Sequence, residues 1–325
     1  MFDFIVTGGA GFIGSAFVWK LNQEGIDNIL IVDDLGETEK WKNLVNLRYA
    51  AYMHKSKFLS MVQKNQLPGK VKAIVHMGAC SSTTERNADY LMENNTDYTW
   101  ALAHAAREMG ARFIYASSAA AYGDGSLGFS DDDGLTMRLK PLNMYGYSKL
   151  LFDQHALKHD LTQKMAGVRF FNVFGPNEYH KGDMASVIFK AYYQIRDAGR
   201  ISLFKSYHPD YADGTQMRDF VYVKDCVEVL WWLINNELVN GIFNLGTGKA
   251  RTWNDLARSV FSALNREPDI DYVEMPESLR GKYQYFTEAT MDKLRGVGCP
   301  VICRPLEEAV ADYVSGYLEK NQAAL

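Results

Sequence analysis

A glycine-rich segment close to the first residue constrains the fold more than any other feature of the sequence. Residues 6–14 read VTGGAGFIG, and they lie between an apolar run and apolar residues at helical spacing over residues 12–24. Gly8 allows a tight turn, Gly11 lets a phosphate approach the backbone, and Gly14 lets the helix pack closely on the strand. Unpaired N–H groups and the helix dipole would meet that phosphate. The segment therefore predicts a dinucleotide site and disfavours a turn without a ligand.

Strand-like and helix-like segments alternate through the first half of the chain. The expected strands are residues 2–6, 28–35, 71–79, 111–118 and 166–175, and the expected helices are residues 12–24, 87–109 and 149–159. This alternation predicts right-handed βαβ units and a doubly wound parallel α/β sheet of the Rossmann type. We expect a dinucleotide-binding domain at residues 1–167 and a smaller C-terminal α/β substrate-binding domain at residues 168–325, with residues 218–238 crossing back.

The composition excludes several classes of protein. The 325 residues are 47% hydrophobic and 23% charged with a net charge of -4, which predicts no nucleic-acid partner. No apolar run approaches the roughly 18 residues that span a membrane, and the first residues lack a secretory signal. Four cysteines are too few for a disulfide framework, so we expect thiols, a cytoplasmic location and no metal site. They are Cys80, Cys226, Cys299 and Cys303.

Two motifs in the middle of the chain place reactive side chains near the expected dinucleotide. Tyr145 and Lys149, in YGYSK, are four residues apart and would share one face of a helix. The ammonium group would lower the pKa of the phenol, which could then take the proton of an alcohol as hydride leaves the carbon. Ser118 ends an expected strand and could hold the reacting oxygen, although serines at strand ends are often capping residues.

Charged residues after the second expected strand bear on the choice of nucleotide. Asp33 and Asp34 follow the glycine loop by about 20 residues, where a carboxylate binds the adenine ribose of NAD. Lys40 and Lys42 follow closely and could meet the 2′-phosphate of NADP. These residues alone leave NAD and NADP open.

Five motifs in a fixed order carry a resemblance to a known family. TGGAGFIG, SSAAAYG, YGYSK, RDFVYVKD and NLGTG stand in the order seen in extended short-chain dehydrogenases/reductases, which include nucleotide-sugar epimerases and dehydratases. Longer segments resemble the ADP-L-glycero-D-manno-heptose 6-epimerases, namely HMGACSSTTE, MENN, PLNMYGYSKLLFD, RFFNVFGPNEYHKGDMAS, LFKS and GKYQYFT. The resemblance covers nearly the whole chain. It implies inversion of C6 of the heptose in an ADP-heptose, a lipopolysaccharide precursor, with bound NADP.

The resemblance also implies roles for individual residues. The implied cofactor contacts are Gly8, Gly11, Phe12, Ile13, Gly14, Asp33, Asp34, Lys40, Lys55, Met77, Gly78, Ala79, Cys80, Ser81, Asn94, Lys149 and Val173. The implied catalytic residues are Tyr145, Lys149, Ser118 and, as a second acid/base, Lys181. The implied substrate contacts are Ser118, Asn172, Asp183, Lys190, Phe204, Lys205, Ser206, Arg218 and Tyr283.

Three positions refine what the resemblance implies. Lys40 matches a lysine of the family, which favours NADP over NAD. Asp183 and Lys190 depart from the family pattern, which has serine and histidine there, and both are positions where a departure would alter nucleotide contacts. Arg218 would bind the diphosphate, because a guanidinium group binds phosphate oxygens bidentately. The alternative for Arg218 is a structural ion pair with Asp219 or another acidic residue.

The implied reaction moves hydride from one face of a sugar carbon to the other. Tyr145 and Lys181 would flank the sugar as two acid/base residues, and the ADP group would hold the oxidised sugar between the two transfers. Ala119 and Ala120 stand where dehydratases have an acid pair, which disfavours a dehydratase. A UDP-galactose 4-epimerase and a nucleotide-binding sensor without activity are the alternatives. We expect a homo-oligomer that pairs through helices near residues 87–109 and 149–159.

Overall fold

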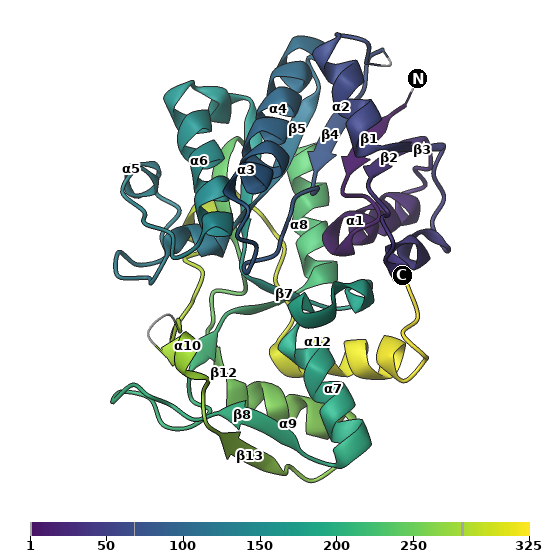
Figure 1. Cartoon of the computed structure of the whole chain (residues 1–325). Coiled ribbons are helices and arrows are strands. Elements are labelled where there is room, and N and C mark those ends of the chain that lie inside the picture. Colours follow the sequence, from purple (N-terminus) through teal and green to yellow (C-terminus); the bar gives the residue numbers. More distant parts are fainter. Residues whose placement is uncertain (1, 68, 281–282) are drawn as a thin grey trace.

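The computed structural model describes residues 2–67, 69–280 and 283–325, and its larger part is built on one parallel sheet (Figure 1). The seven strands lie in the order β11-β6-β5-β4-β1-β2-β3. They are β1 (Phe4–Thr7), β2 (Ile29–Asp33), β3 (Ala51–His54), β4 (Ala73–His76), β5 (Arg112–Ser118), β6 (Met165–Phe170) and β11 (Gly241–Leu245). Strand order reverses between β1 and β4, which is where ligands bind in doubly wound sheets. The predicted Rossmann-type fold is confirmed.

Helices cover both faces of the sheet (Figure 1). One face packs against α1 (Phe12–Gln23) and α8 (Val223–Asn235). The other face packs against α2 (Lys55–Gln63), α4 (Tyr98–Met109) and α6 (Met144–Lys158). Strands that are buried on both sides need apolar residues throughout, and β1 and β2 read FIVT and ILIVD without alternation.

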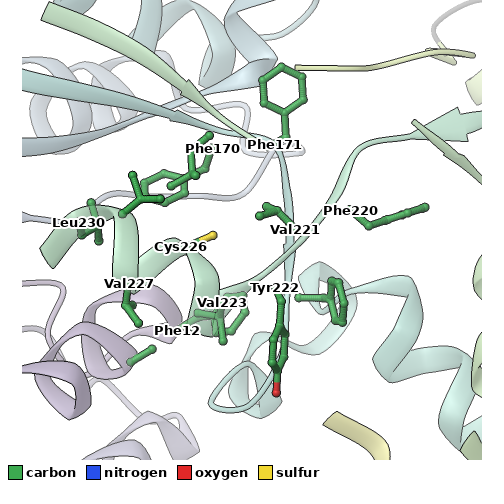
Figure 2. Packing of buried hydrophobic residues seen from close by; sticks show 14 of the residues in the cluster. Phe12, Phe170, Phe171, Phe220, Val221, Tyr222, Val223, Cys226, Val227 and Leu230 are labelled. Carbon is green, nitrogen blue, oxygen red and sulfur yellow. The ribbon is translucent and has the colours of Figure 1, made fainter. Parts of the chain in front are cut away.

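The second half of the chain contributes to this sheet as well. Val223, Cys226, Val227 and Leu230 of α8 belong to the same buried cluster as Phe12 of α1, and Figure 2 shows them around the start of α8. The α8 helix therefore lies against α1 of the first half of the chain. The sheet also extends beyond the predicted domain limits, because residue 167 lies inside β6 and β11 comes from residues 241–245.

Most of the remaining elements form a smaller lobe and its connections (Figure 1). Its helices are α7 (Val187–Ala198), α9 (Trp253–Ala263) and α12 (Leu306–Tyr313). Its strand pairs are β8 (Ile201–Phe204) with β13 (Ile270–Val273), β9 (Met217–Arg218) with β12 (Arg251–Thr252), and β7 (Asn172–Phe174) with β10 (Phe220–Tyr222). Short helices are α3 (Ala88–Leu91), α5 (Asp133–Thr136), α10 (Glu277–Arg280) and α11 (Asp292–Gly296). Of these, α3 and α5 lie beside α6 in the larger part (Figure 1). None of the described helices is long and apolar enough to cross a membrane.

The structure differs from the sequence-based expectation at three places. β3 and α2 fill residues 51–63, where no element was expected. α6 begins at Met144 and not at residue 149, because the Asn143 side chain accepts a hydrogen bond from the Gly146 N–H at 2.8 Å and caps the helix. The strand expected at residues 166–175 is divided into β6 and β7. Residues 281 and 282 of the GKYQYFT segment lie outside the described residues.

The C-terminal residues return from the smaller lobe toward α1 (Figure 1). The Tyr179 hydroxyl donates to the Ala323 carbonyl at 2.8 Å, and the Leu325 N–H donates to Asn177 Oδ1 at 3.0 Å. Leu325 is buried. These two hydrogen bonds hold the C-terminal residues against the segment that contains residues 177–181.

Candidate functional site

The glycine loop joins β1 to α1 at the point where strand order reverses. Gly8 has a φ of 65°, and a Cβ there would lie 2.5 Å from the backbone nitrogen of Gly78, just after β4. A Cβ at Gly14 would overlap the carbonyl oxygen of Gly8. Gly11 precedes the first turn of α1, and no side chain caps that turn. The loop therefore keeps space and unpaired N–H groups for a phosphate.

Two cavities of about 420 Å³ and 170 Å³ adjoin this loop. They share Gly8, Asp33, Lys40, Gly78 and Ala79, so they form one cleft. Every residue implied as a cofactor contact lines the cleft: Gly8, Gly11, Phe12, Ile13, Gly14, Asp33, Asp34, Lys40, Lys55, Met77, Gly78, Ala79, Cys80, Ser81, Asn94, Lys149 and Val173. The structure brings these residues together, and their individual roles stay predictions.

At one end of the cleft, Asp33 is already surrounded by donors. Its Oδ2 accepts from the Ala10 N–H at 2.8 Å, and its Oδ1 accepts from the Asp34 N–H at 2.7 Å and from Lys40 Nζ at 2.8 Å. Lys55 Nζ lies 3.3 Å from Asp34 Oδ2. Asp33 therefore faces Lys40 and Asp34 faces Lys55. The Asp33 carboxylate also points toward the glycine loop, where it binds the Ala10 N–H.

The cleft also holds the predicted catalytic residues Ser118, Tyr145, Lys149 and Lys181. Burial raises the pKa of Tyr145, and the Ser118 hydroxyl opposes that rise. Lys149 Nζ donates to the Ala116 carbonyl at 2.9 Å, and burial lowers its pKa to about 8. The expected lowering of the Tyr145 pKa by Lys149 is therefore not found. The ammonium group is directed at a backbone oxygen, and burial of the phenol dominates.

Lys181 reaches the cleft from the 3₁₀-helix η5 (Tyr179–Met184). Its Nζ lies 5.1 Å from the ring centroid of Phe12, at the start of α1. Burial lowers the pKa of Lys181, while the negative charge of Glu178 opposes this effect. A lowered pKa suits an amine that must both give and take a proton.

A buried ion pair beneath the catalytic residues was missed in the sequence. Arg169 Nε donates to Asp153 Oδ2 at 2.8 Å, and neither side chain is exposed. Asp153 also accepts from the hydroxyls of Ser117 and Tyr115, at 2.8 Å and 3.0 Å. Asp153 follows Lys149 by one helical turn, and that spacing was the only sequence signal. The network fixes the end of β5, which carries Ser118, against α6.

Two asparagines and a histidine near the cleft were also missed. Asn43, in the 3₁₀-helix η1 (Glu39–Leu44), is 3% exposed. Its Nδ2 donates to the carbonyls of Ala10 and Asn177, at 3.0 Å and 2.9 Å. The same Nδ2 lies 3.3 Å from His180 Nδ1. Partners so distant in sequence leave no local pattern, so no sequence signal could have identified this bridge.

Arg218 forms an aromatic cradle with Trp253 and Tyr283 in the smaller lobe. Its guanidinium carbon lies 5.7 Å from the Trp253 ring centroid and 5.3 Å from that of Tyr283. It donates to the carbonyls of Met217 and Gln284, and burial lowers its pKa. The ion pair with Asp219 is absent, since that carboxylate accepts the N–H groups of Thr247, Gly248 and Ala289. Arg218 has no carboxylate partner among the described residues, which keeps its charge for an anion.

The other residues implied as substrate contacts lie around this lobe in separate groups. Lys190 Nζ donates to the Asp183 carbonyl at 2.6 Å, so the two departures from the family pattern contact each other. Lys205 pairs with Glu274 at 2.8 Å, and Phe204 ends β8. The Ser206 N–H donates to Asp213 Oδ1 at 2.7 Å. Asn172 begins β7 and is exposed. None of these residues lines the cleft described above, in contrast to Ser118.

Comparisons with known proteins agree with this geometry. A family model described as NAD dependent epimerase/dehydratase family matches residues 4–246. A protein of Nitratidesulfovibrio vulgaris strain DP4, named ADP-L-glycero-D-manno-heptose-6-epimerase, is 65% identical and covers 97% of this chain and 98% of its own. A protein of Fusobacterium nucleatum with the same name is 47% identical over 99% of each chain.

Solved structures give the same picture. The Helicobacter pylori ADP-L-glycero-D-manno-heptose-6-epimerase matches with a TM-score of 0.80 at 25% identity, covering 96% of this chain and 95% of its own. A UDP-N-acetylglucosamine 4-epimerase of Methanobrevibacter ruminantium has a TM-score of 0.81 at 22% identity over 98% and 100% of the chains, which supports the fold alone. The chain therefore belongs to the NAD dependent epimerase/dehydratase family and, within it, to the ADP-L-glycero-D-manno-heptose-6-epimerases.

Proposed function

We propose that the protein inverts C6 of the heptose in ADP-D-glycero-D-manno-heptose, giving ADP-L-glycero-D-manno-heptose, a precursor of lipopolysaccharide. One observation carries the proposal. Ser118, Tyr145, Lys149 and Lys181 line the same cleft as the glycine loop, in a chain 65% identical to a protein named for this activity. The cleft fits a dinucleotide, because side chains at Gly8 or Gly14 would meet backbone atoms there.

Each residue of the cleft would have its own role in the reaction. Bound nicotinamide would take hydride from C6 and return it to the opposite face of the carbon. Tyr145 would accept the hydroxyl proton in one orientation of the sugar, while Ser118 holds the oxygen. Lys181, which reaches the cleft from another element, would serve the oxygen in the turned orientation. Arg218 would bind the diphosphate and hold the oxidised sugar between the two transfers.

We propose NADP as the nucleotide. A carboxylate that selects NAD must offer its oxygens to the ribose hydroxyls. Here, both Asp33 oxygens accept from Ala10, Asp34 and Lys40. Lys40 stands beside this site with a charge that suits a 2′-phosphate. Releasing the nucleotide from the purified protein and determining its mass tests the choice: NADP supports it, and NAD contradicts it.

The activity is tested with separate incubations of ADP-D-glycero-D-manno-heptose and UDP-galactose. We expect inversion of the heptose at C6, followed by NMR, and no conversion of the galactose. C6-deuterated substrate converted in H₂O should keep its label, because the transferred hydride never exchanges with water, and loss of the deuterium would contradict the proposal. Conversion of UDP-galactose alone would favour the 4-epimerase alternative, and no turnover of either sugar would favour a sensor.

We also propose that the protein is a homo-oligomer that pairs through α4 and α6. Trp100 on α4 and His155 on α6 are half-buried and their rings meet edge to face, with centroids 3.6 Å apart, so an aromatic surface crosses both helices. Sedimentation velocity measures the state directly, and a monomer at micromolar concentration contradicts the proposal.

A further inference from the structure

We propose that His180 is a ligand of the 2′-phosphate of NADP, held in position by Asn43, and that it helps the protein to distinguish NADP from NAD. The inference rests on the proposed function, because it requires NADP as the nucleotide. The sequence motifs predict no role for His180, whereas they predict an acid/base role for its neighbour Lys181.

His180 lines the cleft at the end where the adenosine is expected. The same cavity of about 420 Å³ is lined by Asp33, Thr38 and Lys40. The charges of Lys40, Lys181 and Asp33 all act on the imidazole ring, so the ring lies among the groups that would surround the adenine ribose. These groups come from β2, η1 and the segment of His180 itself, and Asn43 and the Asn177 backbone complete its surroundings.

Asn43 leaves one nitrogen of the ring for a ligand. The Nδ1 atom lies 3.3 Å from Asn43 Nδ2, and Asn43 is fixed by the carbonyls of Ala10 and Asn177. The ring contacts Asn43 through Nδ1 and also the Asn177 backbone, and no side chain among the described residues makes a hydrogen bond with Nε2. The two N–H groups of the Asn43 amide donate to the carbonyls of Ala10, in the glycine loop, and Asn177, three residues before His180. Asn43 therefore links the phosphate-binding loop to the segment that carries the imidazole ring.

The electrostatics of the site suit a phosphate dianion. Burial and the positive charges of Lys40 and Lys181 lower the pKa of His180 to about 4. A phosphate dianion beside the ring would offset the charges of the two lysines, which add to the effect of burial on the imidazole. A neutral imidazole can still donate one hydrogen bond from Nε2, and a nearby phosphate would favour its protonation. The negative charge of Asp33 also acts on the ring, and its ion pair with Lys40 at 2.8 Å offsets part of the repulsion that a phosphate would meet.

Two substitutions separate the two ring nitrogens. His180→Asn keeps an amide near the position of Nδ1 and removes the group at Nε2, whereas His180→Gln keeps a donor near Nε2. Dissociation constants for NADP and NAD are measured by calorimetry on protein stripped of nucleotide. For His180→Asn we expect NADP affinity to fall roughly tenfold or more while NAD affinity changes less than twofold, because a hydrogen bond to a charged group is lost. His180→Gln should restore most of the loss.

The outcomes are distinct. Equal weakening of both nucleotides by His180→Asn would place His180 at the shared diphosphate and overturn the proposal, and unchanged affinity for both would overturn it too. Retained NAD binding shows that the variant is folded. His159→Asn, at an exposed histidine after α6, is the control and should alter neither constant. If the mass of the bound nucleotide is that of NAD, the proposed cofactor fails; if it is NADP and the variants do not discriminate, only this inference fails.

Discussion

Replacing Tyr145 with Phe removes a single oxygen atom from the cleft. The phenol lies beside Ser118, at the end of β5, in the same cavity as the glycine loop. Because it would carry the proton of the reacting hydroxyl, we expect the rate of C6 inversion to fall by roughly 10²- to 10⁴-fold. NADP affinity and melting temperature should stay unchanged. A variant with the full rate of inversion would show that another group accepts the proton.

The Gly14→Ala variant tests whether the glycine loop requires close packing, because the change alters no polar side chain. A methyl group there would overlap the Gly8 carbonyl oxygen, and the backbone on both sides is fixed by β1 and α1. We expect Gly14→Ala to destabilise the fold by about 1–3 kcal/mol and to abolish NADP binding. Urea unfolding and calorimetry measure the two effects.

Gly296→Ala is the matched control for this change. A Cβ at Gly296 meets no atom within 4 Å, so its free energy of unfolding should change by less than about 0.5 kcal/mol. If the two alanine variants behaved alike, close packing of the loop would not be the reason for its glycines.

At the scale of single residues, the sequence predicted what stands in a local motif. The glycine loop, Ser118 and the pair Tyr145 and Lys149 belong to short segments whose spacing implies a geometry. The Asn43 bridge joins residues that are far apart in the chain and no spacing marks it, and for the Asp153–Arg169 pair the only signal was the position of Asp153 one helical turn after Lys149. The direction of the Tyr145 pKa was also missed, because burial depends on the whole fold.

Among the elements, β1, β4 and α4 are joined through one buried histidine. His76 Nδ1 lies 2.5 Å from the Thr7 hydroxyl and its Nε2 lies 2.8 Å from the Thr99 hydroxyl. Burial lowers the pKa of His76 to about 3, whereas histidine in an unfolded chain titrates near 6.5. Below pH 6.5 the unfolded chain therefore binds a proton that the folded protein does not bind. The free energy of unfolding consequently decreases as the pH is lowered.

This linkage predicts a pH-dependent difference between the protein and its His76→Gln variant. The glutamine keeps hydrogen-bonding groups but does not titrate. The stability advantage of the wild type is fully present above pH 6.5, and it should shrink by about 2 kcal/mol between pH 6.5 and pH 5. Urea unfolding of both proteins over this range measures the difference. If the free energies of unfolding of the two proteins changed in parallel with pH, His76 would take up its proton in the folded state as it does in the unfolded chain.

Element prediction succeeded where burial on both faces produced continuous apolar runs, as in β1, β2 and β4. It failed at β3, whose residues AYMH alternate between half-buried and exposed at the edge of the sheet. The start of α6 was missed because MYGYS contains a glycine and two tyrosines, which are weak helix formers. The Asn143 cap and the packing of α6 on the sheet supply the stability that propensity lacks.

For the whole molecule, the C-terminal residues connect the two lobes. Leu325 is 7% exposed, and its N–H binds Asn177 in the segment that leads to His180 and Lys181. Removing a buried leucine side chain leaves a cavity, so Leu325→Ala should lower the free energy of unfolding by about 2 kcal/mol. Leu238→Ala, at a leucine 96% exposed, should change it by less than about 0.5 kcal/mol. Similar melting temperatures for both variants would show that the C-terminal contact contributes nothing.

The place of β11 in the sheet has a consequence during synthesis on the ribosome. β11 covers the outer edge of β6, yet about seventy residues separate the two strands in the chain. At 5–20 residues per second, a nascent chain would wait roughly 4 to 14 seconds with that edge uncovered. An apolar strand with unpaired backbone groups is prone to pair with other chains, so this interval is when the polypeptide most needs a chaperone.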